Sequence, residues 1–445
     1  MQKKRTGNVA ALRDLLTYRR RVILWFLGIA YKIALDTMYA FAASPQYQMG
    51  GLILDFVLWK FALATVMYFT IFAMLPKEKN DTIGFLFHLQ FAITVAPMLT
   101  FYSLSNASTE YMIAIFGCIL LQIMLVEVPA RDSRTIYLKG IRRFAVAALG
   151  IMAVYSLVSI VIANGFVGLR AFDMEYIYEM RGNFVYPAGV GYFVNWLTKA
   201  VIPFALLYAL ERKKYWFAAL CVVTQMVFYI LTGQKITLLI LIPVVFVYYC
   251  ARTGHLLELM YLGLTLAAVA VTMIWQLSQR MGWSVGNTLC SLYAIRTFFH
   301  PADNKFNYFE CFSQLPKSFF SDGQIGAMLG LTYPYAGSLG QVVYAYLGGD
   351  FLAANFNAGY LADAYAQCGY PGMVAVSLLL VFLLRSLRGY DRDRNKCLLV
   401  ALFSVYFIVL NDGALLTTMF TGGFLIAYAL VIIFLGGRKE AGYGV

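Results

Sequence analysis

The chain has 445 residues, of which 61% are hydrophobic and only 13% are charged. Soluble proteins carry about 25% charged residues, so this composition excludes soluble domains, a disordered chain and a disulfide-dense secreted module. The net charge of +13 does not indicate nucleic-acid binding, because the basic residues lie in short segments between apolar runs. We therefore predict an all-α integral membrane protein in which residues 1–445 form a single polytopic domain.

Apolar runs of the length that a bilayer requires, about 20 residues, recur along the chain. We expect about twelve membrane-spanning helices, at 22–43, 51–75, 83–103, 111–128, 144–163, 190–210, 216–232, 236–250, 258–277, 371–388, 397–411 and 414–435. Of the 35 Lys and Arg residues, 25 lie in segments on the side of the N-terminus and 8 on the opposite side. The positive-inside rule then predicts that both termini are cytoplasmic.

The outer side of this predicted topology has two long segments, 164–187 and 278–370. The second is too long for a simple connector, and its last part is rich in glycine and tyrosine. We expect this large outer loop to fold as short interfacial helices and turns that carry the candidate active-site residues.

Two kinds of chemistry have no support in the sequence. There is no phosphate-binding P-loop motif, and His88, His255 and His300 lie too far apart to give a paired-histidine metal motif. We therefore expect neither a cofactor nor a metal ion.

Two pairs of charged residues lie within predicted spans, Lys32 with Asp36 and Asp55 with Lys60. A charge in hydrocarbon is costly and commonly marks a functional site. The alternative is that each pair is a neutralised structural pair that faces the helix bundle.

Three outer cations are candidates for binding an anionic group. Lys235 ends the motif TGQK at a predicted outer hairpin, and Arg170 and Arg181 are the two cations of the loop 164–187. Lysine and arginine both suit phosphate. Lys235 has a second interpretation as an interfacial lysine that extends to the lipid headgroups, and the arginines have one as partners of acidic residues in their own loop.

The large outer loop supplies the remaining candidates. Arg296 has aromatic neighbours that would hold it at the membrane surface, and His300 follows it by four residues. Asn357, Tyr360 and Asp363 lie shortly before the predicted tenth span, where Asp363 is either a functional carboxylate or a solvated helix cap. Aromatic rings stack on sugars and surface cations suit a diphosphate, so this combination indicates a lipid-diphosphate-linked saccharide handled on the outer face.

In these segments the chain resembles the Wzy-type O-antigen and capsular oligosaccharide repeat unit polymerases of bacteria. The resemblance rests on TGQK at 232–235, RTFFHPADNKFNYFECF at 296–312, NAGYLADAYAQCGYPG at 357–372, and the layout with a large penultimate outer loop. It implies a GT-C-like membrane glycosyltransferase of the bacterial cytoplasmic (inner) membrane, with an active site that faces the periplasm.

The resemblance also assigns residues. Lys235 matches the basic position of the family's short hairpin, and Arg296 matches the arginine before its aromatic pair. Asn357 and Asp363 match an Asn–Gly–Asp–Gly pattern before the next span. The related O-antigen ligases carry a histidine beside the asparagine, where this chain has Phe356, and this departure argues against a ligase.

The implied activity is the polymerisation of polyprenyl-diphosphate-linked oligosaccharide repeat units, in which an acceptor hydroxyl displaces polyprenyl diphosphate without a metal. Asp363 and Arg296 are the catalytic candidates, because a carboxylate can take or orient the hydroxyl proton and a cation can stabilise the leaving group. The candidate substrate contacts are Arg170, Arg181, Lys235, Asn357, His300 and Tyr360, and His300 is also the substitute base. The expected partners are the lipid-linked substrate, the bilayer and a chain-length regulator, and the alternative functions are a lipid-linked oligosaccharide flippase or transporter, or a ligase.

Overall fold

The computed structural model describes residues 2–76, 81–128, 140–165, 184–234, 237, 239–323, 326, 328–351, 354–391 and 395–436, with side chains from Tyr18 onward. All regular structure in these ranges is helical, and the one β-bridge joins Asp55 to Ser105. The α-helices are α1 (Gln2–Met38), α2 (Ser44–Tyr47), α3 (Leu58–Met74), α4 (Thr82–Gln90), α5 (Ala96–Leu104), α6 (Thr109–Glu127), α7 (Ile141–Asn164), α9 (Val190–Trp196), α10 (Ile202–Glu211), α11 (Tyr215–Thr232), α13 (Leu241–Arg252), α14 (Leu256–Met281), α15 (Val285–Leu289), α16 (His300–Gln314), α18 (Leu339–Tyr346), α19 (Gly359–Leu387), α20 (Lys396–Val409), α21 (Leu415–Phe420) and α22 (Phe424–Leu435).

The predicted class, an all-α integral membrane protein, is confirmed. Within the described ranges, 8 helices are long and apolar enough to cross a membrane. Four shorter apolar helices, α3, α13, α20 and α22, lie where the sequence analysis placed the other four spans. The count of twelve spans and the cytoplasmic position of the termini stay predictions.

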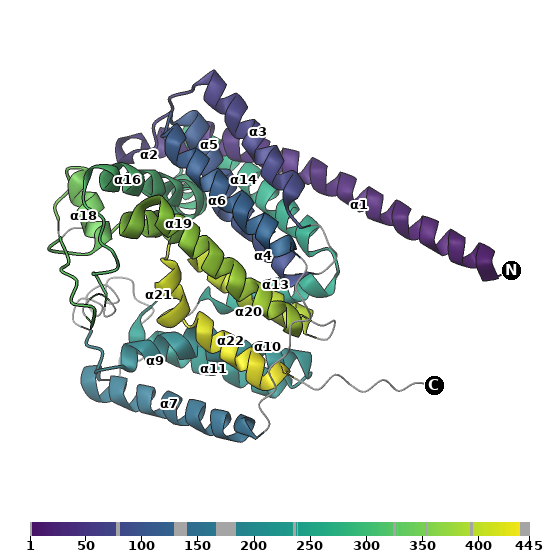
Figure 1. Cartoon of the computed structure of the whole chain (residues 1–445), viewed down its shortest axis with the longest axis vertical. Helices are drawn as coiled ribbons and strands as arrows, with labels where there is room; N and C mark the ends of the chain where they lie inside the picture. Colours follow the sequence, from purple (N-terminus) through teal and green to yellow (C-terminus); the bar gives the residue numbers. More distant parts are fainter. Residues whose placement is uncertain are drawn as a thin grey trace.

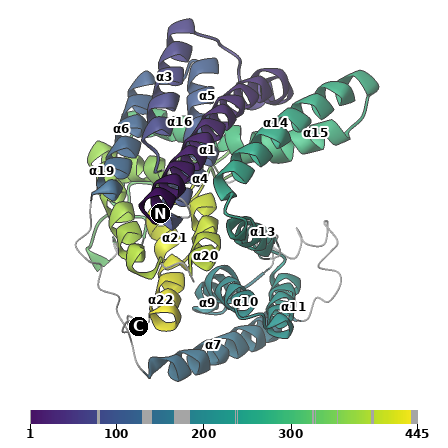
Figure 2. The same ribbon diagram turned by 90° about the vertical axis from the view of Figure 1, so that its right-hand side faces the viewer.

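The two ends of the helix bundle are formed by different parts of the chain. Figure 1 places the start of α1 and the end of α22 at one end, and α16 and α18 at the opposite end. The segment from α4 to α5 is buried along its whole length, whereas α7 is mostly exposed. A helix that is apolar all round belongs in the middle of a bundle, and Figure 2 shows α4 there.

Three predicted spans are interrupted by a π-helical turn, at Tyr39–Ala43, Phe91–Val95 and Leu197–Val201, and a fourth π-segment, Cys290–Phe299, precedes α16. Each is followed two residues later by a proline at the start of the next helix: Pro45, Pro97, Pro203 and Pro301. Proline has no N–H and its ring collides with the carbonyl four residues earlier. The preceding turn widens as a result, which is a common origin of helix distortion.

The helix α19 is bent at Gly369, which has φ 67° and ψ −150°, with Pro371 just beyond it. This backbone conformation is essentially restricted to glycine. The bend separates a short N-terminal segment, which carries Asp363, from the segment that the sequence analysis predicted to span the membrane at 371–388.

We predict that Gly369→Ala lowers the free energy of unfolding by about 1–3 kcal/mol, because alanine is strained in this conformation. The matched control is Gly150→Ala, at a helical glycine with open space around it, where alanine should stabilise the helix by about 1 kcal/mol or less. Thermal unfolding of the two purified variants in detergent checks the prediction. Equal melting temperatures for both would contradict it.

Candidate functional site

The two sequence segments singled out in the large outer loop pack on each other at the end of the bundle away from the start of α1 (Figure 1). Asn304 Nδ2, on α16, donates to the carbonyl oxygen of Asn357 at 3.2 Å. The Tyr308 hydroxyl donates to the carbonyl oxygen of Phe356 at 2.9 Å. The segment before α19 is therefore held against α16 by hydrogen bonds from α16 side chains to its backbone carbonyl oxygens.

A buried lysine joins this pair to a third segment. Lys305 Nζ donates to the carbonyl oxygen of Pro301 at 2.9 Å and to Asn411 Oδ1 at 3.2 Å. Asn411 Oδ1 also accepts from Thr94 Oγ1 at 3.0 Å. Lys305 is 3% exposed, so its ammonium group depends on these oxygens in place of water.

Gly359 allows the three segments to meet. Its φ is +70°, and a Cβ atom there would lie 2.5 Å from the Asn411 carbonyl oxygen and 2.8 Å from Lys305 Cε. No larger residue fits without moving the backbone. Glycine at the start of α19 is thus required by packing.

Lys305 and Asp412 influence each other's protonation at this junction. Burial lowers the pKa of Lys305 to about 8, and the negative charge of Asp412 opposes that shift. Burial raises the pKa of Asp412, and Lys305 opposes this in turn. A pKa near 8 leaves Lys305 mostly protonated at neutral pH.

His300, at the start of α16, lies between aromatic rings. Its ring centroid is 6.0 Å from that of Tyr47 and 5.6 Å from that of Phe356. Burial lowers the pKa of His300, and the positive charges of Arg296 and Lys305 lower it further. These surroundings favour the neutral imidazole, which is the form that can accept a proton. His300 is therefore a better candidate for a base than for a positively charged substrate contact.

Asp363 is half-buried on the part of α19 that precedes the bend at Gly369. Gln367 follows it by one turn and hydrogen-bonds its carboxylate. Gln367 Nε2 also donates to Asp322 Oδ1 at 3.1 Å. The chain around Ser318 is pinned to the same helix, where the Phe319 N–H donates to the Gln367 carbonyl oxygen at 2.9 Å. Asp363 therefore has a second carboxylate, Asp322, beside it.

The other predicted contacts fall in different places. Arg296 and Asn357 are exposed, as a substrate contact requires. Tyr360 is buried, and its hydroxyl accepts from Gln122 Nε2 at 3.0 Å and from Gln90. A cavity of about 10 Å³ between Tyr360, Gln90 and Lys305 is too small for a sugar, so a substrate would contact the outer side of this cluster.

Arg170, Arg181 and Lys235 lie outside the described residues, and their roles stay predictions. Next to Lys235, Gln234 Nε2 donates to the Tyr186 hydroxyl at 2.7 Å. This bond ties the hairpin after α11 to the segment before α9.

The sequence analysis missed Asn304, Lys305, Asn411 and Asp412. Lys305 is one of the 8 basic residues that the sequence analysis placed on the side opposite the N-terminus, but nothing in its local sequence indicates that it is buried. Asn411 and Asp412 follow an apolar run in the tetrapeptide NDGA, which indicates a turn. Their distance along the chain from 296–312 hides the contact.

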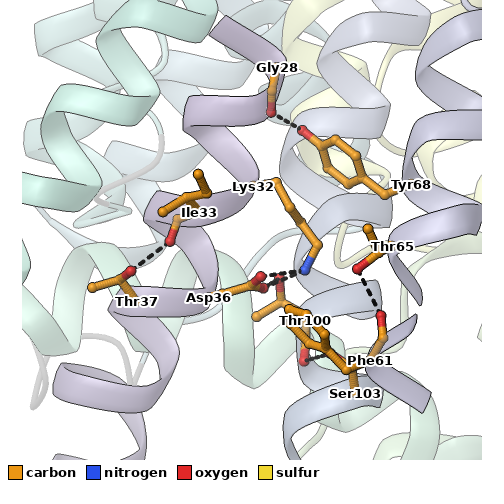
Figure 3. Close-up of polar contacts among 10 residues, drawn as sticks. All are labelled: Gly28, Lys32, Ile33, Asp36, Thr37, Phe61, Thr65, Tyr68, Thr100 and Ser103. Carbon is orange, nitrogen blue, oxygen red and sulfur yellow. Dashed lines mark hydrogen bonds and ion pairs between the residues drawn. The ribbon is translucent and has the colours of Figure 1, made fainter. Parts of the chain in front are cut away.

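The charged residues inside predicted spans have protein partners, and Figure 3 shows those of Lys32 and Asp36. Lys32 Nζ contacts both carboxylate oxygens of Asp36, at 2.7 Å for Oδ2, and Thr100 Oγ1 donates to Asp36 Oδ1 at 2.8 Å. Lys60 Nζ donates to the carbonyl oxygens of Asn106 and Ala107 at 3.0 and 2.7 Å. The contacts of Lys32 and Asp36 fit the structural interpretation of that pair. Asp55 and Lys60 form no ion pair: Asp55 is exposed and accepts from Asn106 Nδ2 at 2.9 Å, on the same segment that Lys60 contacts.

Comparison of the chain with models of protein families, with curated proteins and with solved structures finds no match. Among the described residues, no group of three or more His, Cys, Asp and Glu side chains is arranged to hold a metal ion.

We predict that Asp303→Asn stabilises the protein at pH 8 but not at pH 4. Asp303 is 7% exposed and packs against Gly51, and burial raises its pKa to about 7 from an ordinary value near 4. Because the folded pKa is the higher one, the stabilising contribution of the protonated group is complete below pH 4 and lost as pH rises to about 7.

Asparagine is permanently neutral, so it removes this loss, which is on the order of 4 kcal/mol above pH 7. The measurement is the free energy of unfolding of both proteins across this pH range. A constant difference between them at all pH values would contradict the prediction.

We predict that Asp36→Ala lowers the free energy of unfolding by roughly 3–5 kcal/mol, because it leaves the Lys32 ammonium group buried without its partner. The double variant Lys32→Met/Asp36→Leu should recover most of that loss. Unfolding and activity are measured on both variants. A double variant that is no more stable than Asp36→Ala would contradict the prediction, and one that folds normally but no longer functions would show that this pair has more than a structural role.

Proposed function

We propose that this protein is a GT-C-like glycosyltransferase that polymerises polyprenyl-diphosphate-linked oligosaccharide repeat units at the outer leaflet of a bacterial cytoplasmic membrane. One observation supports the proposal most strongly. The two segments that resemble Wzy-type polymerases lie far apart in sequence, yet they pack on each other around Lys305. Arg296, His300, Asn357 and Asp363 all belong to these two packed segments.

The reaction places negative charge on a leaving diphosphate. The acceptor hydroxyl oxygen forms a bond to the anomeric carbon of the donor unit, and the bond from that carbon to the diphosphate oxygen breaks. Fixed cations stabilise the charge that develops. In this proposal Arg296, which is exposed, contacts the diphosphate, and the buried Lys305 adds its positive charge from behind.

The acceptor hydroxyl loses its proton as it attacks. Asp363 is the proposed acceptor of that proton, because it is held by Gln367 beside Asp322. Two nearby carboxylates raise each other's proton affinity, which suits a base. His300 is neutral in its aromatic surroundings and is the alternative base.

The runner-up is a flippase for the same lipid-linked oligosaccharide. The observation that favours it is a chain of polar side chains that leads from the site into the bundle. Gln122 Nε2 donates both to the Tyr360 hydroxyl at 3.0 Å and to Ser377 Oγ at 2.9 Å. A transport path usually has its binding site near the middle of the membrane, whereas most candidate groups here lie at one end.

We predict that Arg296→Gln lowers the rate of polymer formation by about 100-fold or more, as the loss of one fixed transition-state contact does in other enzymes. The matched control is Arg280→Gln, which removes one exposed positive charge from the end of α14. Products made by each purified variant from the lipid-linked repeat unit are separated on a gel. If both variants retain the wild-type rate and length distribution, Arg296 has no catalytic role.

A further inference from the structure

An apolar groove lies between α10, α11 and α13, which Figure 2 shows grouped at one edge of the bundle. Its volume is about 930 Å³. Val222 and Met226 of α11 form one wall, Ile242, Phe246 and Tyr249 of α13 form the other, and Leu206 of α10 lies at the back.

The groove has the length of one lipid leaflet. Its lining runs along α13 from Leu241 to the following Thr253, and a helix of twelve residues, Leu241–Arg252, is roughly 18 Å long. Half of a typical hydrocarbon core is about 15 Å. An extended chain from one leaflet therefore fills the groove along the membrane normal.

One end of the groove is rimmed by positive charge. The turn between α10 and α11 consists of Arg212, Lys213 and Lys214, and Arg252 ends α13; all four are exposed. Tyr215 and Trp216 follow the turn and are 63% and 72% exposed. Exposed aromatic residues beside basic ones are typical of the membrane–water interface.

Hydrogen bonds bring the two basic segments together. The Tyr248 hydroxyl donates to Glu211 Oε2 at 2.7 Å and accepts from Arg252 Nη1 at 3.3 Å. Arg212, next to Glu211, stacks over the Tyr208 ring at 4.9 Å. The nearby carboxylate is thus engaged by a tyrosine, and both guanidinium groups are positioned by aromatic rings.

We propose that this groove binds an anionic phospholipid, with one acyl chain between α11 and α13 and the headgroup phosphate on Arg212, Lys213 and Arg252. An apolar groove alone would accept any lipid. The basic rim selects a headgroup with net negative charge, because each Lys or Arg near the surface attracts anionic lipid. The site is independent of the proposed glycosyl transfer.

The test is native mass spectrometry of the purified protein titrated with phosphatidylglycerol, with phosphatidylcholine and with polyprenyl phosphate. We expect phosphatidylglycerol to be retained in preference to the other two. The double variant Arg212→Gln/Lys213→Gln should weaken its binding roughly 30-fold. The control Arg19→Gln/Arg21→Gln removes two exposed charges from α1 and should leave binding unchanged.

A second pair of variants tests the groove itself. Val222→Trp fills it, whereas Val223→Trp makes the same change at the next residue, which is 55% exposed and outside the groove. Only the first should reduce retention of phosphatidylglycerol, with both variants checked for a normal melting temperature. If the first does not fold, the charge variants decide alone.

Three results would overturn the proposal: equal retention of phosphatidylcholine, equal losses in variant and control, or preferential binding of polyprenyl phosphate. The last would assign the groove to the isoprenoid chain of a substrate. None of these results bears on polymerisation, which is measured separately by its products.

Discussion

The buried ammonium group of Lys305 holds α16 against the turn after α20. Lys305 has only protein oxygens around it, from Pro301 and Asn411, and leaving it without them would cost several kcal/mol. It therefore requires α16 and the turn after α20 to stay in contact. Position 359, at the start of α19, must be glycine, because only a residue without a side chain fits between Lys305 and that turn. The candidate groups of the outer segments keep their relative positions as long as this contact holds.

Much of the fold follows from composition and spacing. The bilayer demands apolar runs with internally satisfied backbones, so the long helices appear where the sequence is apolar. The apolar pattern does not predict where each helix widens or bends. The π-turns before Pro97 and Pro203 and the bend at Gly369 come from single residues whose effect on the hydrogen-bond ladder depends on their neighbours. The proline signal was present in the sequence, but its geometric outcome was not.

The site was predictable only in its exposed parts. Aromatic residues around Arg296 and the Asn–Gly pattern near Asp363 indicate a polar outer region, and the structure shows that the two segments pack together. Burial is a different matter, because it is a property of contacts between distant segments. Nothing near Lys305 in the sequence predicts that Asn411 approaches it, and nothing near Tyr360 predicts that its hydroxyl binds Gln122 inside the bundle. Two cations in neighbouring parts of the sequence, Arg296 and Lys305, thus have opposite environments: Arg296 is exposed and Lys305 is buried.

The central claim is that the outer cluster transfers glycosyl units between lipid-linked substrates. The most direct measurement is to reconstitute the wild-type protein in sealed vesicles with a polyprenyl-diphosphate-linked repeat unit, then separate the products by size while following the side of the bilayer that the lipid occupies. The account predicts a ladder of products spaced by one repeat unit, formed without nucleotide or added metal. Movement of the intact lipid across the bilayer with no change in its size would contradict the account and identify a flippase.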